Sequence, residues 1–273
     1  RQSINYLAVK RGVCMAKQLT PETKISTTNE QQILVRNKDL VNELMGHVSF
    51  TEMFFLHLMQ RMPSKGEIAI FDAVLVTLME HGLTPSAIAT RLTIMAAPES
   101  VQGAISAGLQ GIGSGLVGTM EGMAKNLQDI ITAEEGVEAS CLRIVNGFKA
   151  TRQAIPGFGH PFHKPDDPRT PRLFEIARQA GVEGRYIDIV TTLSKTVDQV
   201  YGKHLTINAT GAIAVVLSEI GVPWDVMRGI AVVTRSAGLL GHISEEREHP
   251  IAPFIYSHIE DTVPYTGKRT LDD

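Results

Sequence analysis

The sequence predicts an all-α protein, and three observations support this fold class. Apolar residues recur three and four positions apart through most of the chain, as in helices with one buried face. Short groups of capping and helix-breaking residues separate these stretches. Evidence for strands is thin, because only Ile33–Val35 fits a short strand and no segment alternates for long enough to build a sheet.

Start and stop signals predict where the helices lie. Residues 49–52 and 64–67 match capping boxes, and Thr84 followed by Pro85 is a favoured helix start. Residues 208–220 are apolar all round, which predicts a helix buried on every side. We expect irregular chain after Pro250. The expected helices cover residues 39–48, 50–62, 65–81, 85 onward, 116–131, 137–148, 170 onward, 186–201, 208–220 and 224–243.

Charge and composition exclude several classes of function. Among 273 residues, 26 Lys and Arg face 29 Asp and Glu, for a net charge of −3. A nucleic-acid binder needs a surplus of cations, which this chain lacks. For the same reason an anionic membrane surface would not attract it. With 43% apolar residues the chain can bury a core, yet no apolar run approaches the roughly 20 residues that cross a bilayer. Two cysteines allow at most one disulfide, so we expect a reduced, cytoplasmic protein.

The first 36 residues are expected to form an N-terminal extension and an irregular segment. Residues 1–14 carry an apolar patch that is too short for a signal peptide and has no cleavage site after it. We interpret them as an upstream extension, with Met15 as the natural start.

Residues 103–122 contain seven glycines, which lower helix propensity by about 1 kcal/mol at each interior position. Glycine here serves either close helix packing or the approach of backbone to a ligand, and packing is the favoured interpretation. The segment lacks the Gly-Lys-Ser/Thr of a phosphate loop, and no strand precedes it as in a dinucleotide site.

Residues 155–169, Ile-Pro-Gly-Phe-Gly-His-Pro-Phe-His-Lys-Pro-Asp-Asp-Pro-Arg, form a second unusual segment. Four prolines and two glycines stiffen a long turn from which ionisable side chains project. A metal site from His160, His163 and Asp166 is conceivable, but the spacing suits no common zinc pattern, and we predict no metal.

This loop resembles the signature of the citrate synthase superfamily, which includes citryl-CoA lyase and the carboxy-terminal module of ATP-citrate lyase. Met79-Glu80-His81-Gly82 is similar to a family segment whose histidine touches the oxaloacetate or citrate moiety, and residues 234–242 are similar to its arginine segment. The short length and residues 50–53 and 78–86 favour citryl-CoA lyase.

The resemblance implies a citrate synthase-like fold in a dimer or higher homo-oligomer. Each chain would have a large helical domain, residues 37–118 and 216–273, and a small helical domain, residues 119–215, that carries the CoA-binding loop. It implies no permanently bound cofactor, with a coenzyme A thioester and a di- or tricarboxylate as the small-molecule partners.

The resemblance also assigns roles to individual residues. His160 would act at the hydroxyl that becomes the oxaloacetate carbonyl, as base in cleavage and hydrogen-bond donor in condensation. Arg169 and Arg235 suit the carboxylates because guanidinium makes two charge-assisted hydrogen bonds at once, and His81 would be a third contact. We expect His163 and His242 to be structural or solvent-facing. The residues expected to contact CoA are Gly157, Phe158, Gly159 and Lys164.

For two of these residues, the sequence without the resemblance also allows another interpretation. His81 fits a helix-end histidine that meets free carbonyl groups, and Arg235 fits a surface ion pair with Glu245 or Glu246.

Two departures from the citrate synthase pattern bear on activity. The family's His-Gly pair is matched by Val117-Gly118, so support for an oxyanion would come from backbone N–H groups or Ser114. The catalytic aspartate of its Asn-Val-Asp-Gly stretch is matched by Thr210, which is not a carboxylate base. We therefore expect a lyase of citryl-CoA or a related 3-hydroxy-acyl-CoA, with Thr210 as a hydroxyl relay. The alternatives are a condensing acyltransferase of the citrate synthase type and a catalytically weak CoA-thioester-binding partner subunit.

Overall fold

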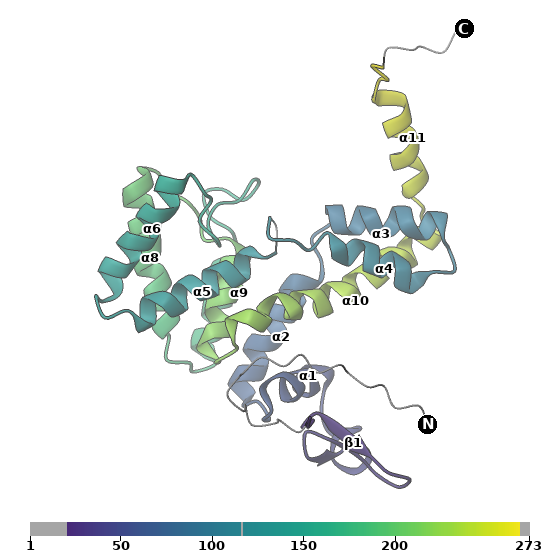
Figure 1. Ribbon diagram of the computed structural model, residues 1–273, viewed down its shortest axis with the longest axis horizontal. Coiled ribbons are helices and arrows are strands. Elements are labelled where there is room, and N and C mark those ends of the chain that lie inside the picture. Colours follow the sequence, from purple (N-terminus) through teal and green to yellow (C-terminus); the bar gives the residue numbers. More distant parts are fainter. Residues whose placement is uncertain (1–20, 116, 268–273) are drawn as a thin grey trace, which may run out of the picture. The chain divides into compact units, whose positions relative to one another are not determined.

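The computed structural model describes residues 21–115 and 117–267, which form two compact units (Figure 1). The first unit ends at Arg61 and the second begins at Met62. The expected extension at residues 1–14 and the start at Met15 lie outside the described residues.

The first unit contains a small antiparallel sheet. Strand β2 (Ile33–Val35), the strand that the sequence predicts, pairs with β1 (Ser26–Thr28) and with β3 (Lys38–Asp39). The helix expected over residues 39–48 is wrong in length, because only the short π-helix η1 (Leu40–Leu44) forms. Gly46 takes a positive φ of 76°, which turns the backbone out of a helix. Helix α1 (Phe50–Met59) follows with the predicted capping box.

The described elements of the second unit are all helices, beside one isolated β-bridge between Phe158 and Ile207, and the predicted fold class is confirmed. Ser64 and Glu67 form the second capping box, and Thr84 caps a helix with Pro85 in its first turn. The helices are α2 (Lys65–Met79), α3 (Pro85–Ala96), α4 (Val101–Gln110), α5 (Thr119–Thr132), α6 (Val137–Thr151), α7 (Arg169–Gln179), α8 (Arg185–Tyr201), α9 (Ala209–Glu219), the 3₁₀ turn η2 (Trp224–Val226), α10 (Met227–Glu248) and α11 (Ala252–Thr262). None of the helices described is both long and apolar enough to span a lipid bilayer.

Helix α9 forms the centre of one half of this unit. It is buried on nearly every side, as its sequence predicts, and it packs against α2, α5, α7 and α8 (Figure 1). Helices α6 and α8 lie side by side. Cys141, on α6, is fully buried and its thiol is free. Burial raises the pKa of that thiol to about 11.

Helix α10 organises the other half of the unit, where it packs against α2, α3 and α4. A Cβ atom at Gly238 would collide with the carbonyl oxygen of Met79, so glycine lets the end of α2 approach the α10 backbone. In the glycine-rich segment, Gly108 likewise faces Thr90 and Leu239. The packing interpretation is therefore confirmed for Gly108, which lies on α4.

The chain after Pro250 differs from the expected irregular tail. Helix α11 forms there because its first backbone N–H groups have a partner from another helix: the carboxylate of Glu246 accepts hydrogen bonds from Ile251 N, at 2.9 Å, and Ala252 N, at 2.8 Å. Neighbouring residues gave no sign of this cap. The division into domains at residues 118 and 216 stays a prediction.

A pair of glycine substitutions on α10 tests the close approach at Gly238. We expect Gly238→Ala to lower the free energy of unfolding by about 1–3 kcal/mol, because the added methyl overpacks against α2. A Cβ at Gly241 meets nothing within 4 Å, so Gly241→Ala is the matched control. It should raise stability by about 0.5–1 kcal/mol through helix propensity. Urea denaturation measures both, and equal effects would contradict this account of the crossing.

Candidate active site

The predicted site residues of the second unit come from four places in the chain and lie near one another. His81 follows the end of α2, His160 lies in the long loop, Arg169 begins α7, and Arg235 lies in the middle of α10. The ring centroid of His81 is 6.2 Å from that of His160. Both Arg169 and Arg235 are close enough to His81 to help lower its pKa, although burial is the larger cause.

The loop that carries His160 is joined to the start of α9 by a series of hydrogen bonds. Asn208 N donates to Gly157 O at 3.0 Å, and the side-chain amide of Asn208 donates to Gly159 O at 2.9 Å. Gly159 N donates to Thr206 O at 2.8 Å. A Cβ on Gly211 would lie 2.5 Å from Gly157 O, so two glycines are needed where the loop crosses the helix. His160 is therefore placed by α9 as well as by its own loop.

The hydrogen bonds of His160 determine which of its ring nitrogens carries the proton. Nδ1 accepts from the backbone N–H of Phe162, at 3.1 Å, and of His163, at 2.9 Å. A neutral ring in this setting has its proton on Nε2. Burial and the neighbouring His163 lower the pKa of His160, which favours the neutral form. His160 is thus a neutral donor through Nε2.

His163 lies closer to the site than the sequence suggested. Its ring is half-buried, with centroid separations of 4.3 Å from His160 and 6.4 Å from His81. His163 was expected to be structural or solvent-facing, and the turn after His160 places both rings near His81. Three imidazoles therefore gather near two guanidinium groups.

Arg169 is held by Asp167, a buried residue that the sequence analysis did not single out. The carboxylate of Asp167 accepts from Arg169 Nε at 2.9 Å, Arg169 Nη2 at 2.7 Å, Arg169 N at 3.1 Å and Ala209 N at 3.0 Å. Burial alone would raise the pKa of Asp167, but these contacts hold it below its ordinary value. The aspartate two positions before the arginine was the available signal.

The same contacts argue against a metal ion. Ligand atoms of His160, His163 and Asp167 lie within 4.8 Å of one another. Each oxygen of Asp167, however, already accepts two hydrogen bonds, and two arginines stand nearby. Asp166, the carboxylate proposed from the sequence, is exposed and instead lies 3.1 Å from His204 Nε2. These residues do not fit a cation site.

Arg235 has a buried nitrogen available for a ligand. Its Nη1 is enclosed and has no hydrogen-bond partner among the described residues. Burial lowers the pKa of this guanidinium, while Glu80 opposes that shift. The alternative ion pair with Glu245 or Glu246 is wrong, because both carboxylates contact Arg91. A buried donor of this kind normally has a partner, and an incoming carboxylate would supply one.

Thr210 lies at the start of α9 with its hydroxyl already engaged. It donates to Asn208 Oδ1 at 2.7 Å, and its oxygen is 2.7 Å from Thr119 Oγ1. Since the single proton of Thr210 is used by Asn208, Thr119 is the donor of the second contact. The order Thr119 to Thr210 to Asn208 connects α5 with the hydrogen bonds that hold the His160 loop.

Comparison with known proteins identifies the family of this chain. Residues 34–253 match the family described as "Citrate synthase, C-terminal domain". The chain belongs to the citrate synthase family.

Solved structures and curated members of the citrate synthase family resemble this chain to different degrees. Citryl-CoA lyase from Hydrogenobacter thermophilus is 30% identical, with a TM-score of 0.80 over 92% of this chain and 96% of that one. ATP citrate lyase from Methanothrix soehngenii, solved with citrate and coenzyme A, shares the fold at 20% identity and a TM-score of 0.75, over 93% of this chain and 43% of that one. Citrate synthase from Synechocystis is 25% identical over 81% of this chain, which spans 57% of that relative's length.

The family resemblance predicts that two sets of backbone N–H groups bind the substrate, but in this structure they donate to backbone carbonyl groups of the same chain. Val117 N and Gly118 N donate to Gly113 O at 3.2 and 3.1 Å, so these two N–H groups are not free for an oxyanion. In the loop expected to contact CoA, the N–H groups of Phe158 and Gly159 also have backbone partners. Lys164 is exposed, and its contact with CoA stays a prediction.

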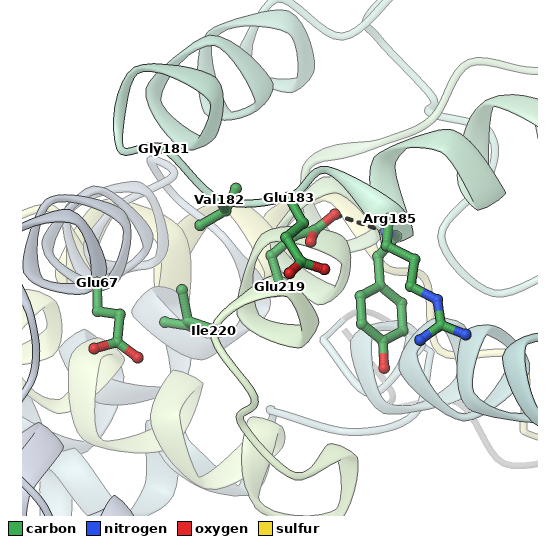
Figure 2. A pocket seen from close by; sticks show the side chains of 8 residues that line it. Glu67, Gly181, Val182, Glu183, Arg185, Glu219 and Ile220 are labelled. Carbon is green, nitrogen blue, oxygen red and sulfur yellow. Dashed lines mark hydrogen bonds between the residues drawn. The ribbon is translucent and has the colours of Figure 1, made fainter.

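A separate cavity of about 350 Å³ contains none of the predicted site residues (Figure 2). It lies at the beginning of α2, after α7 and at the end of α9, where Glu219 accepts from Tyr186 N at 2.7 Å and Ile187 N at 2.9 Å. These bonds satisfy the first turn of α8, so we interpret the carboxylate as a helix cap.

The contact between the site loop and the segment after α8 should depend on pH. His204 faces Asp198 at 2.7 Å and Asp166 at 3.1 Å, and these contacts, Asp198 first, raise its pKa. Because the pKa of His204 is higher in the folded state, its protonation stabilises the fold fully at pH values below the unfolded-state pKa of about 6.5. This stabilisation is lost as the pH rises through the folded-state pKa. We expect His204→Gln to destabilise more at about pH 5.5 than at about pH 9.

Urea denaturation at both pH values measures this difference, with His47→Gln, at an exposed position in the first unit, as the control. An equal cost of His204→Gln at the two pH values would contradict the ion pairs.

Proposed function

We propose that the protein is a carbon–carbon lyase that cleaves citryl-CoA, or a related 3-hydroxy-acyl-CoA, into acetyl-CoA and oxaloacetate or a related 2-oxo acid. The observation that carries this proposal is the gathering of three imidazoles around Arg169 and Arg235, with the buried Nη1 of Arg235 unpartnered among the described residues. Similarity to citryl-CoA lyase from Hydrogenobacter thermophilus over nearly the whole of both chains supports it.

The two arginines suit the free carboxylates of such a substrate. Arg235 offers the buried Nη1, which would gain a charge-assisted hydrogen bond in a setting with little water. Arg169 is held in one orientation by two side-chain hydrogen bonds to Asp167, so it loses little freedom when it binds a second anion. His81 lies close to both and adds a neutral polar contact.

Cleavage breaks the bond between the carbinol carbon and the methylene group of the thioester arm. The hydroxyl loses its proton and becomes a carbonyl, while the electron pair passes to the acetyl-CoA enolate, which then takes a proton. His160 Nε2–H would donate to the oxygen where charge develops. Because its Nδ1 already accepts two hydrogen bonds, the base for the hydroxyl proton would be another imidazole. The adjacent ring of His163 is the candidate for that step.

Thr210 favours cleavage over synthesis. Synthesis requires a base that removes a weakly acidic proton from acetyl-CoA, and a hydroxyl whose proton is held by Asn208 is a poor one. Cleavage requires a proton donor to the enolate, which the Thr119–Thr210 pair or a water molecule could supply. A condensing acyltransferase is therefore less well supported, and a CoA-thioester-binding partner subunit without turnover is the second alternative.

Coenzyme A would enter as part of the substrate, with Lys164 placed to meet a phosphate group, and no permanently bound cofactor is needed. We also propose a homodimer or higher homo-oligomer. Helix α11 exposes the large apolar residues Phe254, Tyr256 and Ile259, and this supports association because exposed apolar surface gathered on one element commonly marks an interaction site. The cytoplasmic location stays a prediction from the sequence.

Turnover of citryl-CoA by the purified protein tests the proposed reaction, with mass spectrometry of the products. We expect His160→Ala to lower kcat by about 10²–10³, as for loss of a hydrogen-bond donor to the oxygen where charge develops. Arg235→Gln should raise KM about tenfold or more, since a hydrogen bond to a charged group is lost. Arg143→Ala, which removes an exposed ion pair with Glu135, is the control. Binding of citryl-CoA without cleavage of it or its analogues would favour the partner-subunit alternative.

Replacement of Thr210 tests whether this residue is the reason that cleavage is favoured over synthesis. We expect Thr210→Asp to introduce exchange of the acetyl-CoA methyl protons with D2O, because a carboxylate is placed at the start of α9 as a base. Thr210→Asn has similar size and no basic group, so it should stay inactive in exchange. Mass spectrometry of acetyl-CoA measures deuterium uptake, and equal uptake in the two variants would show that position 210 does not control this step.

A further inference from the structure

Behind His81 and Arg235 lies a chain of polar side chains that neither contacts the reacting atoms nor has a role in the proposed chemistry. It contains Glu80, which follows α2, His242 on α10 and Arg91 on α3. Arg91 is 1% exposed and His242 is 8% exposed, while the side chain of Glu80 is about half exposed, at 48%. The chain connects parts of the sequence that are about 150 residues apart.

Glu80 holds the backbone on which His81 stands. Its Oε1 accepts from His81 N at 2.7 Å and from Gly82 N at 2.6 Å. Its Oε2 lies 3.0 Å from His242 Nε2. Burial alone would raise the pKa of Glu80, but His81 N, then His242, and Gly82 N hold it below its ordinary value, so the carboxylate is charged. That charge also faces Arg235.

His242 lies between Arg91 and Glu80. Its Nδ1 accepts from Arg91 Nε at 3.0 Å, and because guanidinium only donates, the ring proton lies on Nε2. Nε2 lies 3.0 Å from Glu80 Oε2, a close contact that lacks the alignment of a hydrogen bond. His242 therefore fills the space between the guanidinium of Arg91 and the carboxylate of Glu80, and its burial agrees with the structural role that was one of the two expectations for it.

Arg91 is fixed from behind by two carboxylates. Its Nη1 donates to Glu246 Oε2 at 2.8 Å, and its Nη2 contacts Glu245. Since Glu246 also caps the first turn of α11, the chain of contacts runs from that helix to His81. Buried ion pairs of this kind add little net stability, because desolvation offsets their attraction, but the hydrogen bonds of Arg91 and Glu80 constrain the geometry of both side chains.

The backbone of α10 brings the two halves of the arrangement together. Arg235, Gly238 and His242 are three and four residues apart, so they share one face of the helix. Gly238 admits the end of α2 against this face, which places Glu80 between His242 and Arg235. The same crossing that shapes the fold therefore sets the distance between the two substrate-binding residues.

We propose that Glu80, His242 and Arg91 are positioning residues for the carboxylate end of the substrate: Glu80 fixes His81 and faces Arg235, and the two buried groups hold Glu80 in place. This proposal rests on the proposed function, since it takes His81 and Arg235 as carboxylate contacts. A role in folding alone would be the competing account, because Glu246 also anchors α11.

Two ligands that bind different parts of the site distinguish these accounts. We would measure binding of oxaloacetate and of coenzyme A to the full chain by calorimetry. Glu80→Gln and His242→Ala should weaken oxaloacetate about tenfold or more, as expected when a hydrogen bond to a charged group is lost. Coenzyme A affinity should change less than about twofold, because its contacts lie on the long loop. His242→Gln retains a donor and should recover part of the loss, and Arg143→Ala is the remote control.

Each outcome decides the question. Variants that bind oxaloacetate as tightly as the wild type would overturn the positioning role and leave the proposed function standing. Loss of both ligands together with a lower midpoint of unfolding in Glu80→Gln, the nearly isosteric variant, would assign the chain to folding and overturn the proposal. A wild type that binds coenzyme A but neither oxaloacetate nor citrate would overturn the proposed function first, and the positioning role with it.

Discussion

The buried carboxylate of Asp167 is the contact on which the arrangement of the site depends. It receives four hydrogen bonds, three from Arg169 and one from the first residue of α9, and its own N–H donates to Thr206. One charge therefore fixes the start of α7, the start of α9 and the end of the long loop. A buried carboxylate that lost these partners would be costly, so the three segments are held together whether or not a ligand is present.

The electrostatic character of the site follows from this crowding. Burial lowers the pKa of both His81 and His160, and neighbouring arginines and imidazoles lower it further. A positive charge on either ring is therefore disfavoured. These two imidazoles are thus neutral donors and acceptors, while the permanent positive charge is supplied by guanidinium. An anionic substrate would meet fixed cations for binding and these two uncharged rings for hydrogen bonding, which separates the two tasks chemically.

Local signals in the sequence predicted much of the fold. The capping boxes at Ser49 and Ser64 and the cap at Thr84 depend on residues three positions apart, and each helix starts where its cap lies. The prediction was wrong where a distant group or a single backbone angle decides. Helix α11 depends on Glu246, and the helix expected over residues 39–48 ends early near Gly46. Among the site residues, His160, Arg169 and Arg235 belong to a recognisable pattern. Arg91 and His242 meet only through tertiary packing, which no local spacing reveals.

Three helices have one end at the candidate active site and the other at the cavity lined by Glu219 (Figure 2). Helix α2 leads to His81, α7 starts at Arg169 and α9 starts beside Thr210. A helix of 11 residues is about 16 Å long and nearly incompressible along its axis. We therefore expect a change that pushes on the cavity end to displace a site residue along the helix axis. Engineering for thermostability that fills this cavity has to preserve the positions of all three helices, or its gain in packing would be offset by misalignment about 16 to 22 Å away.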